Sequence, residues 1–453
     1  MKDLTILNIA AACGGRYHGP KELENKEVTD VTTDSRKVLK GALYVPIRGE
    51  RFDGHSFSPA VMEAGALVTL TERAEGMPDC PYILVKDTRE ALQEIAGFYR
   101  RALDVRVVGI TGSVGKTSTK EMIASVLKEK YRVLKTSGNL NNNIGLPLTI
   151  FRLTEEDEIA VLEMGISHFG EMTWLAETAE PDTMVITNIG TCPLEFLKDR
   201  DGVFAAKTEC FDYVKLDGTV ILNGDDDKLC QVTDVHGKRP IFYGMSPRCR
   251  VYAENVRPLG LDGTACTICI DDDSFDVTVP LPGRHMLMNA LAGAAVGAQY
   301  GLDFDEIRRG IESVETLSGR FHIVKGKKAT VIDDCYNANP MSMKASLSVL
   351  ADVETRKVAV LGDMGELGDG GRELHREVGS YAADLAVDSY ILVGELSEEI
   401  AEGLKAGGSK AEIHEFAAVE EALAALDGYI REGDTVLVKA SHFMHFEKIV
   451  QAL

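Results

Sequence analysis

Apolar residues in this chain form either short continuous runs or stretches with helical spacing, and short polar segments separate these stretches. An apolar run at residues 105–110 is typical of a buried strand, a glycine-containing loop follows it, and residues 118–130 carry apolar side chains at helical spacing. Later apolar runs also end in polar residues; they lie at 159–162, 184–187, 220–222, 329–332, 357–361, 390–393 and 435–438. The pattern predicts open α/β sheets, in which ligands gather at the carboxyl ends of the strands.

Smaller elements occupy the rest of the chain. Residues 4–12 predict a helix, and 28–33 and 42–46 predict short strands. Residues 249–281 alternate between apolar and polar, which predicts an insertion of antiparallel strands. Residues 284–300 are rich in Ala and Gly and predict a helix that packs closely against a neighbour.

The loop after the first of these strands has the composition of a phosphate cradle. It reads Thr-Gly-Ser-Val-Gly-Lys-Thr from Thr111 to Thr117. Its glycines let backbone N–H groups turn toward an anion, the lysine reaches β- and γ-phosphates, and Thr117 offers a hydroxyl to Mg²⁺. The expected nucleotide contacts are Gly112, Ser113, Gly115, Lys116, Thr117 and Ser118. Ile110 stands where the full eight-residue pattern has its first glycine, so an ordinary glycine turn is the alternative.

The length of the chain, 453 residues, exceeds what one hydrophobic core supports. We expect an α/β protein of three domains. These are a small α/β N-terminal domain at 1–103, a central P-loop domain with a parallel sheet that binds ATP at 104–316, and a Rossmann-like C-terminal domain at 317–453.

Charge and cysteine usage narrow the class of protein. A formal net charge of −22 argues against a sequence-independent nucleic-acid binder but allows anionic substrates held by a few local cations. We see no signal peptide and no apolar run of membrane-spanning length. The nine cysteines are scattered, and we interpret the Cys266–Cys269 pair as packing within a strand. We therefore expect a cytoplasmic protein, and a monomer.

Further polar residues stand near strand ends and on helices. Glu163 follows an apolar run and is a candidate Mg²⁺ ligand beside Thr117. The asparagine-rich segment 137–145 is either turn chemistry or a set of amides that faces a substrate. Asn289 is either a contact to a base edge or a satisfied buried amide, and Lys207 taken alone is a solvated lysine on a helix.

The outer domains carry polar clusters of their own. Residues 33–36 and 48–55 combine Arg, small donors and Gly, which suits a diphosphate or a sugar, although each taken alone is more often a solvated loop. In the last domain, residues 333–340, 362–367 and 439–442 follow predicted strands. Three such domains around a nucleotide site indicate an enzyme.

In this order, these segments resemble the Mur ligases, over essentially the whole chain. The resemblance is carried by 34–36, 48–55, 111–117, 138–147, 162–165 and 333–340. It implies a ligase of peptidoglycan precursor synthesis that uses ATP and Mg²⁺, and the segment 361–368 points to the substrates UDP-N-acetylmuramoyl-tripeptide and D-alanyl-D-alanine. ATP would phosphorylate the terminal carboxylate of the tripeptide, and the amine of the dipeptide would attack the acyl phosphate.

The resemblance also implies roles for residues at matching positions. Lys116, Glu163 and Lys207 would be catalytic: Lys116 on phosphate, Glu163 with Thr117 on one Mg²⁺, and Lys207 as a carbamate that binds a second Mg²⁺. The other implied contacts are Asn289 to adenine, Arg320 and Asp334 to ATP after domain closure, Ser35 and Arg36 to the uridine nucleotide, and Asn139, Asn142 and His168 to the muramoyl-peptide cleft.

Three positions depart from the family pattern. Pro193 stands where a histidine usually supports the second Mg²⁺, Met286 stands where an asparagine is usual, and Lys439-Ala-Ser-His442 replaces Lys-Gly-Ser-Arg. They leave two alternatives open. One is a relative with a different acceptor or carboxylate, such as a folate-type ligase, and the other is a non-catalytic nucleotide-binding paralogue.

Overall fold

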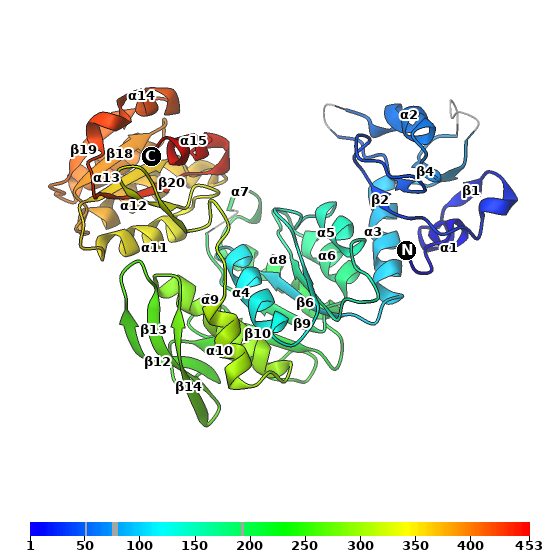
Figure 1. Cartoon of the computed structure of the whole chain (residues 1–453), viewed down its shortest axis with the longest axis horizontal. Helices are drawn as coiled ribbons and strands as arrows, with labels where there is room; N and C mark the ends of the chain where they lie inside the picture. The colour runs from blue at the N-terminus through cyan, green and yellow to red at the C-terminus, as the bar shows by residue number, and fades with distance from the viewer. Residues whose placement is uncertain (50–51, 75–79, 192–193) are drawn as a thin grey trace. The chain divides into compact units, whose positions relative to one another are not determined.

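Three β-sheets form the framework of the protein (Figure 1), and they bear out the α/β fold class with three domains. The computed structural model describes residues 1–49, 52–74, 80–191 and 194–453. By internal packing the chain divides into two compact units. The first comprises Met1–Thr111, Tyr131–Val185 and Thr208–Val220, and the second comprises Gly112–Lys130, Ile186–Lys207 and Ile221–Leu453. The expected domain boundaries at 103/104 and 316/317 stay a prediction.

The N-terminal sheet has five strands in the order β1-β5-β4-β3-β2. The strands are β1 Arg16–His18, β2 Val31–Thr32, β3 Leu43–Tyr44, β4 Val68–Thr71 and β5 Tyr82–Leu84, and the helices are α1 Ile6–Ala12, α2 Ser58–Glu63 and α3 Thr88–Arg101. Strands β2 to β5 pair in parallel, and β1 joins antiparallel at the edge. The polar residues that follow β2, β3 and β4 therefore lie at one edge of this sheet.

The central sheet has nine strands in the order β14-β13-β12-β11-β10-β9-β6-β8-β7. The strands are β6 Arg106–Thr111, β7 Val133–Lys135, β8 Ile159–Glu163, β9 Thr183–Ile186, β10 Thr219–Asn223, β11 Ile241–Gly244, β12 Val251–Pro258, β13 Thr264–Ile270 and β14 Asp273–Val279. The helices are α4 Lys116–Lys128, α5 Gly145–Ile150, α6 Glu171–Ala179, α7 Leu194–Leu197, α8 Arg200–Thr208, α9 Arg284–Gln299 and α10 Phe304–Glu312.

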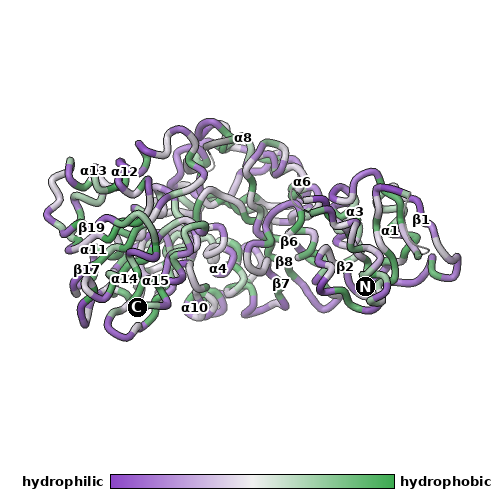
Figure 2. Tube along the Cα trace, turned by 90° about the horizontal axis from the view of Figure 1, so that it is seen from above, coloured by the Kyte–Doolittle hydropathy of each residue, from purple (hydrophilic) through white to green (hydrophobic). Residues whose placement is uncertain are grey.

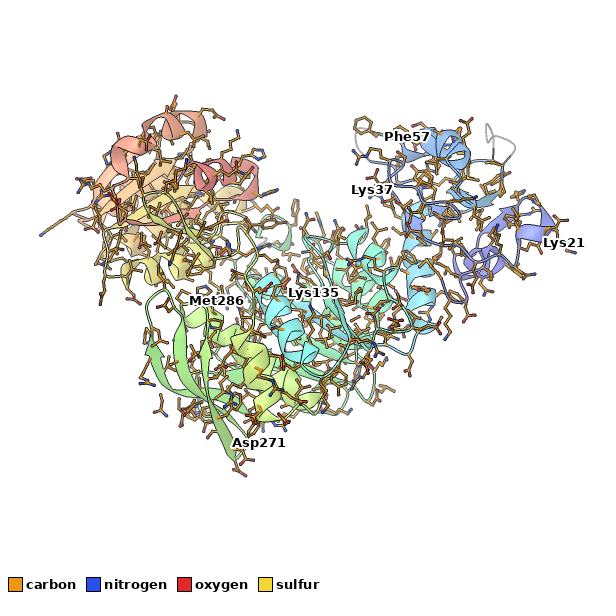
Figure 3. All side chains as sticks on the ribbon, in the orientation of Figure 1. Lys21, Lys37, Phe57, Lys135, Asp271 and Met286 are labelled. Carbon is orange, nitrogen blue, oxygen red and sulfur yellow. The ribbon has the colours of Figure 1, made fainter. Side chains whose placement is uncertain are left out.

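The predicted antiparallel insertion is confirmed as β12, β13 and β14. Figure 3 shows Asp271 at the far end of the hairpin between β13 and β14. Cys266 and Cys269 both lie in β13, three positions apart, so their side chains leave opposite faces of the strand. Both are buried and free, which agrees with packing rather than metal binding.

The C-terminal sheet has six strands in the order β15-β16-β20-β17-β18-β19. The strands are β15 His322–Lys325, β16 Thr330–Asp333, β17 Lys357–Gly362, β18 Ser389–Val393, β19 Glu412–Phe416 and β20 Thr435–Lys439, and the helices are α11 Pro340–Ala351, α12 Gly371–Ala383, α13 Ser397–Ala406, α14 Val419–Tyr429 and α15 Glu447–Ala452. Alternate residues of β17, Val358 and Val360, pack in one cluster with α14 and α15. Helix α11 lies on the other side of the strands (Figure 1).

The predicted small-residue helix is α9, and its glycines explain how closely it packs on α4. A Cβ on Gly293 would lie 2.9 Å from Cγ of Met122, and one on Gly297 would lie 2.8 Å from Cγ1 of Val126. Glycine at both positions therefore fixes the separation of the two helices, and α9 supports the helix that carries the phosphate loop.

Apolar stretches fill the interior of each part, and polar stretches lie mostly on the outer turns (Figure 2). Among the helices in the described part of the chain, none combines the length and the apolar character needed to cross a bilayer.

Candidate nucleotide-binding site

The phosphate loop follows the carboxyl end of strand β6, which lies between β9 and β8 in the central sheet. The residues of β6 from Val107 to Thr111 are buried, and α4 begins at Lys116, two residues before the helix expected from the sequence. Gly112 has φ +149°, and a Cβ there would lie 2.0 Å from Oγ1 of Thr187. Gly115 is the N-cap at φ +81° and offers no side chain to the first N–H groups of α4. An uncapped helix start of this kind suits a phosphate.

Lys116 and Thr117 occupy the first turn of α4. The ammonium of Lys116 donates to the carbonyl of Gly112 at 2.9 Å, so the side chain folds over its own loop. Thr117 is buried, and Ser118 is half-buried beside it. The geometry keeps the lysine within the loop that would hold phosphate.

The loop is shaped by a second strand end; the sequence placed polar residues there but did not predict their contact with the loop. The side chain of Asn188, just after β9, accepts a hydrogen bond from the N–H of Val114 and donates one to its carbonyl, both at 2.9 Å. Thr187 Oγ1 also donates to that carbonyl, at 2.6 Å. Ser113 donates its N–H to the carbonyl of Asn188 at 3.1 Å, and its Oγ accepts from the N–H of Gly190 at 2.9 Å. The N–H groups of Ser113 and Val114 are therefore already bonded, which leaves phosphate to the N–H groups after them.

Asn289 lies on α9 against the start of α4. Its Oδ1 accepts from Oγ1 of Thr119 at 2.8 Å, and its Nδ2 donates to Sδ of Met286 at 3.4 Å. The side chain is buried, as in the satisfied-amide alternative, and it stands 3.6 Å from where a Cβ of Gly115 would be. The contact to adenine stays a prediction.

Glu163 ends strand β8, in register with Ile110 of β6. It is 2 % exposed, its N–H donates to Oγ1 of Thr136, and its Oε1 accepts from Nδ2 of Asn141 at 2.9 Å. A buried carboxylate at a strand end is a suitable oxygen donor for Mg²⁺. Asn141 was missed among the asparagines, although it holds this carboxylate and its carbonyl accepts from Gly165 N–H.

The side chain of Asn142 serves the backbone. It accepts from the N–H groups of Ile144 and Gly145, at the start of α5. Asn139 is exposed. His168 is also exposed and lies 3.5 Å from Oε1 of Glu171. For Asn142 the geometry is the turn chemistry that the sequence left open, and the roles of all three toward a substrate stay predictions.

Lys207 lies near the end of α8 and is 1 % exposed. The expectation of a solvated lysine, which sequence alone gives, is therefore wrong. Taking an ammonium out of water is costly, so a lysine buried here needs polar or charged partners. Pro193, the departure expected at the second Mg²⁺, lies outside the described residues.

In the N-terminal domain, Arg36 folds back on its own loop. Its guanidinium donates to both oxygens of Asp34, at 2.8 and 2.9 Å, and this pairing lowers the pKa of Asp34 to about 2. Across the same sheet edge, Asp53 accepts from Arg73 at 2.8 Å and lies 2.7 Å from Nδ1 of His55. Ser35 stands between Asp34 and Arg36 in the sequence. The loops that follow the strands of this sheet therefore carry arginine side chains and small polar residues.

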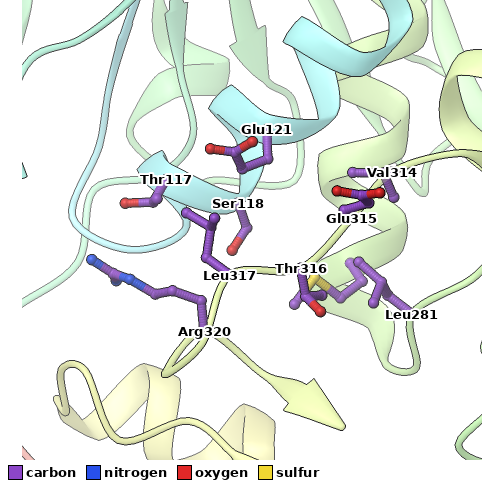
Figure 4. Close-up of a pocket in the computed structure, with 10 residues that line it drawn as sticks. Thr117, Ser118, Glu121, Leu281, Val314, Glu315, Thr316, Leu317 and Arg320 are labelled. Carbon is purple, nitrogen blue, oxygen red and sulfur yellow. The ribbon is translucent and has the colours of Figure 1, made fainter. Parts of the chain in front are cut away.

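A small pocket lies at the start of α4 and is lined by Arg320. Its lining is Thr117, Ser118, Glu121, Leu281, Met286, Val314, Glu315, Thr316, Leu317 and Arg320. Figure 4 shows Arg320 and Leu317, from the segment after α10, opposite Thr117 and Ser118. Asp334 does not line it: its Oδ1 accepts from the N–H of Phe321, and its Oδ2 lies 2.5 Å from Nζ of Lys439. The predicted contact of Asp334 to ATP stays a prediction.

This arrangement of strand, glycine loop and helix defines a P-loop nucleotide-binding protein. Family models match three consecutive parts of the chain: the Mur ligase family catalytic domain at 27–100, the Mur ligase middle domain at 110–297, and the Mur ligase glutamate ligase domain at 319–442. The chain belongs to the Mur ligase family.

Several relatives match the chain over nearly its full length. It is 38% identical to the UDP-N-acetylmuramoyl-tripeptide–D-alanyl-D-alanine ligase of Bacillus subtilis, with 99% of this chain and 98% of that protein covered. It is 37% identical to the Escherichia coli ligase of the same name, with 95% of each covered. Among solved structures, MurF from Acinetobacter baumannii superimposes with a TM-score of 0.91 at 30% identity, covering 99% and 98%. MurF of Thermotoga maritima in complex with ADP gives 0.83 at 31% identity, covering 93% and 96%.

Proposed function

We propose that the protein is an ATP-dependent ligase that adds D-alanyl-D-alanine to UDP-N-acetylmuramoyl-tripeptide in peptidoglycan precursor synthesis. One observation carries the proposal: relatives of that name match this chain from end to end at 37–38% identity, and the matched region includes the phosphate loop with its uncapped helix start. The ligation reaction expected from the sequence is the one for which these relatives are named.

The chemistry divides into two transfers. The tripeptide carboxylate attacks the γ-phosphorus of ATP, the bond to ADP breaks, and an acyl phosphate forms. The uncharged amine of D-alanyl-D-alanine then attacks the acyl carbon, loses a proton, and expels phosphate as the amide forms. Positioning and neutralisation of phosphate charge supply most of such catalysis.

The residues of the site suit these tasks. Lys116 and the N–H groups at the start of α4 hold the β- and γ-phosphates, and Arg320 faces the same pocket. Bound Mg²⁺ would supply charge neutralisation on the phosphates, and Thr117 and Glu163 offer oxygen ligands for it. Glu163 fits this task because it is a buried carboxylate held by Asn141.

We assign Lys207 the carbamate role. Its burial argues against a merely solvated ammonium, and a carbamate would turn it into an anionic oxygen ligand for Mg²⁺. Ser35 and Arg36 are assigned to the uridine nucleotide, and Asn139, Asn142 and His168 to the peptide cleft. The protein acts in the cytoplasm, where these precursors would be made.

The test is release of ADP and phosphate with UDP-N-acetylmuramoyl-tripeptide, ATP and Mg²⁺, with and without D-alanyl-D-alanine. We expect turnover only with the dipeptide, and mass spectrometry should find the pentapeptide product. The control acceptors, each offered in place of D-alanyl-D-alanine, are D-alanine, L-alanyl-L-alanine and L-glutamate. Turnover with one of these instead favours a relative with another acceptor, and ADP binding without any turnover favours a non-catalytic paralogue.

A further inference from the structure

Arg320 is carried by an unusual piece of backbone. Gly319 before it has φ +75°, and Phe321 after it has φ +56°. The left-handed region is uncommon for an aromatic residue, and Phe321 is also buried, at 1 % exposed. Strain of this kind persists only where the surroundings determine it, and it clusters at functional positions.

Two adjacent carboxylates hold that backbone. Oδ2 of Asp333 accepts from the N–H of Gly319 at 2.7 Å, and Oδ1 of Asp334 accepts from the N–H of Phe321 at 3.1 Å. The N–H of Tyr336 donates to the carbonyl of Gly319 at 3.0 Å. The residues on both sides of Arg320 are thus tied to the end of strand β16 and the turn after it.

The side chain of Arg320 is held as well. Its guanidinium carbon lies 3.9 Å from the centre of the Tyr336 ring, within the range of a cation–π contact. The ring of Tyr336 also stacks on His442, with centroids 5.0 Å apart and planes 25° apart. Nearby, Nζ of Lys439 donates to the carbonyl of Asn337 at 3.0 Å and so anchors the turn that carries Tyr336.

The held guanidinium belongs to a residue of the nucleotide pocket. Arg320 lines that pocket together with Thr117 and Ser118 of the first turn of α4 (Figure 4). A free arginine side chain loses rotamer freedom when it binds phosphate, whereas a guanidinium already stacked has lost most of it. A ligand that meets a prepared cation binds more tightly for this reason.

We propose that Tyr336, supported by His442, is a positioning residue that prepares Arg320 for the polyphosphate of ATP. The inference rests on the proposed function, in which Arg320 acts on ATP. Tyr336 itself touches the guanidinium and acts through it.

A double-mutant cycle tests the inference. We expect Tyr336→Leu to raise the KM for ATP about threefold to tenfold, with a smaller change in kcat, and Tyr336→Phe to restore the parent KM because it keeps the ring. His442→Ala should give an intermediate rise. In the Arg320→Ala background, Tyr336→Leu should change the KM no further.

Other outcomes overturn the inference. An equal rise of KM by Tyr336→Leu with and without Arg320 would mean that the ring acts independently of the guanidinium. An unchanged KM and kcat in Arg320→Ala would remove the role of Arg320 in ATP binding, and the inference with it. If the parent protein shows no turnover that depends on the dipeptide, this result contradicts the proposed ligase. None of the results with the variants does so. Should Tyr336→Leu fail to fold, His442→Ala, made in the parent and in the Arg320→Ala background, completes the cycle.

Discussion

The side-chain amide of Asn188 is bonded to both backbone polar groups of Val114, its Oδ1 to the N–H and its Nδ2 to the carbonyl, each at 2.9 Å. Two segments that lie more than 70 residues apart in the chain therefore share one backbone geometry. The phosphate loop is shaped by the end of β9 as much as by its own glycines.

Removal of this amide should impair nucleotide binding. In Asn188→Ala, the N–H and carbonyl of Val114 lose their partner, and we expect a loss of about 1–3 kcal/mol from the loop and a KM for ATP raised about tenfold. Asn188→Asp should be no better, because its second oxygen would face the Val114 carbonyl. Steady-state kinetics at varied ATP concentrations measure the KM, and calorimetric titration with ADP measures the accompanying loss of nucleotide affinity.

Asn223 provides the matched control for this variant. It donates to the carbonyl of Thr187 at 2.8 Å, one strand further along, and does not bond to the loop. Asn223→Ala should lower stability with a smaller change in the KM for ATP. Equal effects of the two variants on KM would mean that Asn188 is only structural.

Lys116→Ala should abolish ligation and leave the fold intact. The ammonium is held within the loop that would bind phosphate. Its loss would remove a positive charge that stabilises the transferred phosphate, so we expect kcat/KM to fall more than about 100-fold. The free energy of unfolding should change by less than about 0.5 kcal/mol. Lys128→Ala, at the exposed end of the same helix, is the control and should keep full activity. Near-normal turnover in Lys116→Ala contradicts the assignment of the loop to ATP.

Lys207 should carry a carbamate in the active protein. Incubation with ¹³C-bicarbonate should give a carbamate signal in ¹³C spectra of the parent protein, and Lys207→Ala should lack it. The variant should also lose activity, and short carboxylates should restore part of it. Identical spectra of the two proteins would contradict the assignment, whatever their activities.

Burial of His285 makes folding sensitive to acid. Burial lowers the pKa of this imidazole from 6.5 to about 4, and the neighbouring Asp334 only partly opposes the shift. Between these pH values the unfolded chain binds a proton there that the folded protein does not, so stability falls as the pH drops from about 6.5 to about 4. The loss reaches up to about 3 kcal/mol.

Urea unfolding at a series of pH values measures this slope. His285→Gln should flatten it, because a neutral amide cannot take up the proton. His445→Gln, at an exposed histidine of the C-terminal domain, is the control for the substitution itself. A parent-like slope in His285→Gln would assign the acid sensitivity to other groups.

The sequence alone determined the family, the fold class and the succession of strand, glycine loop and helix that forms the candidate nucleotide site. Strand β6, the loop and α4 follow one another in the chain, so their succession can be read from the sequence. Gly112 could be recognised because the backbone conformation of the loop at this position favours glycine. The parallel strands β6, β8, β9, β10, β16, β17, β18 and β20 were predicted to within one residue, since their apolar runs are continuous, but the buried strand β4 was missed. The strands β15 and β19 lie at sheet edges, are half exposed, and therefore left no continuous apolar run.

Only the tertiary structure decided which polar residues meet. Asn188, Asn141 and Tyr336 act on segments far from them in the chain, and no spacing in the sequence records such contacts. The same holds for Lys207, whose burial depends on neighbours rather than on its own helix. Periodicity reports which face of an element is apolar, but the partners of a buried polar group are set by packing between elements, because each hydrogen bond needs a donor and an acceptor brought within about 3 Å of each other.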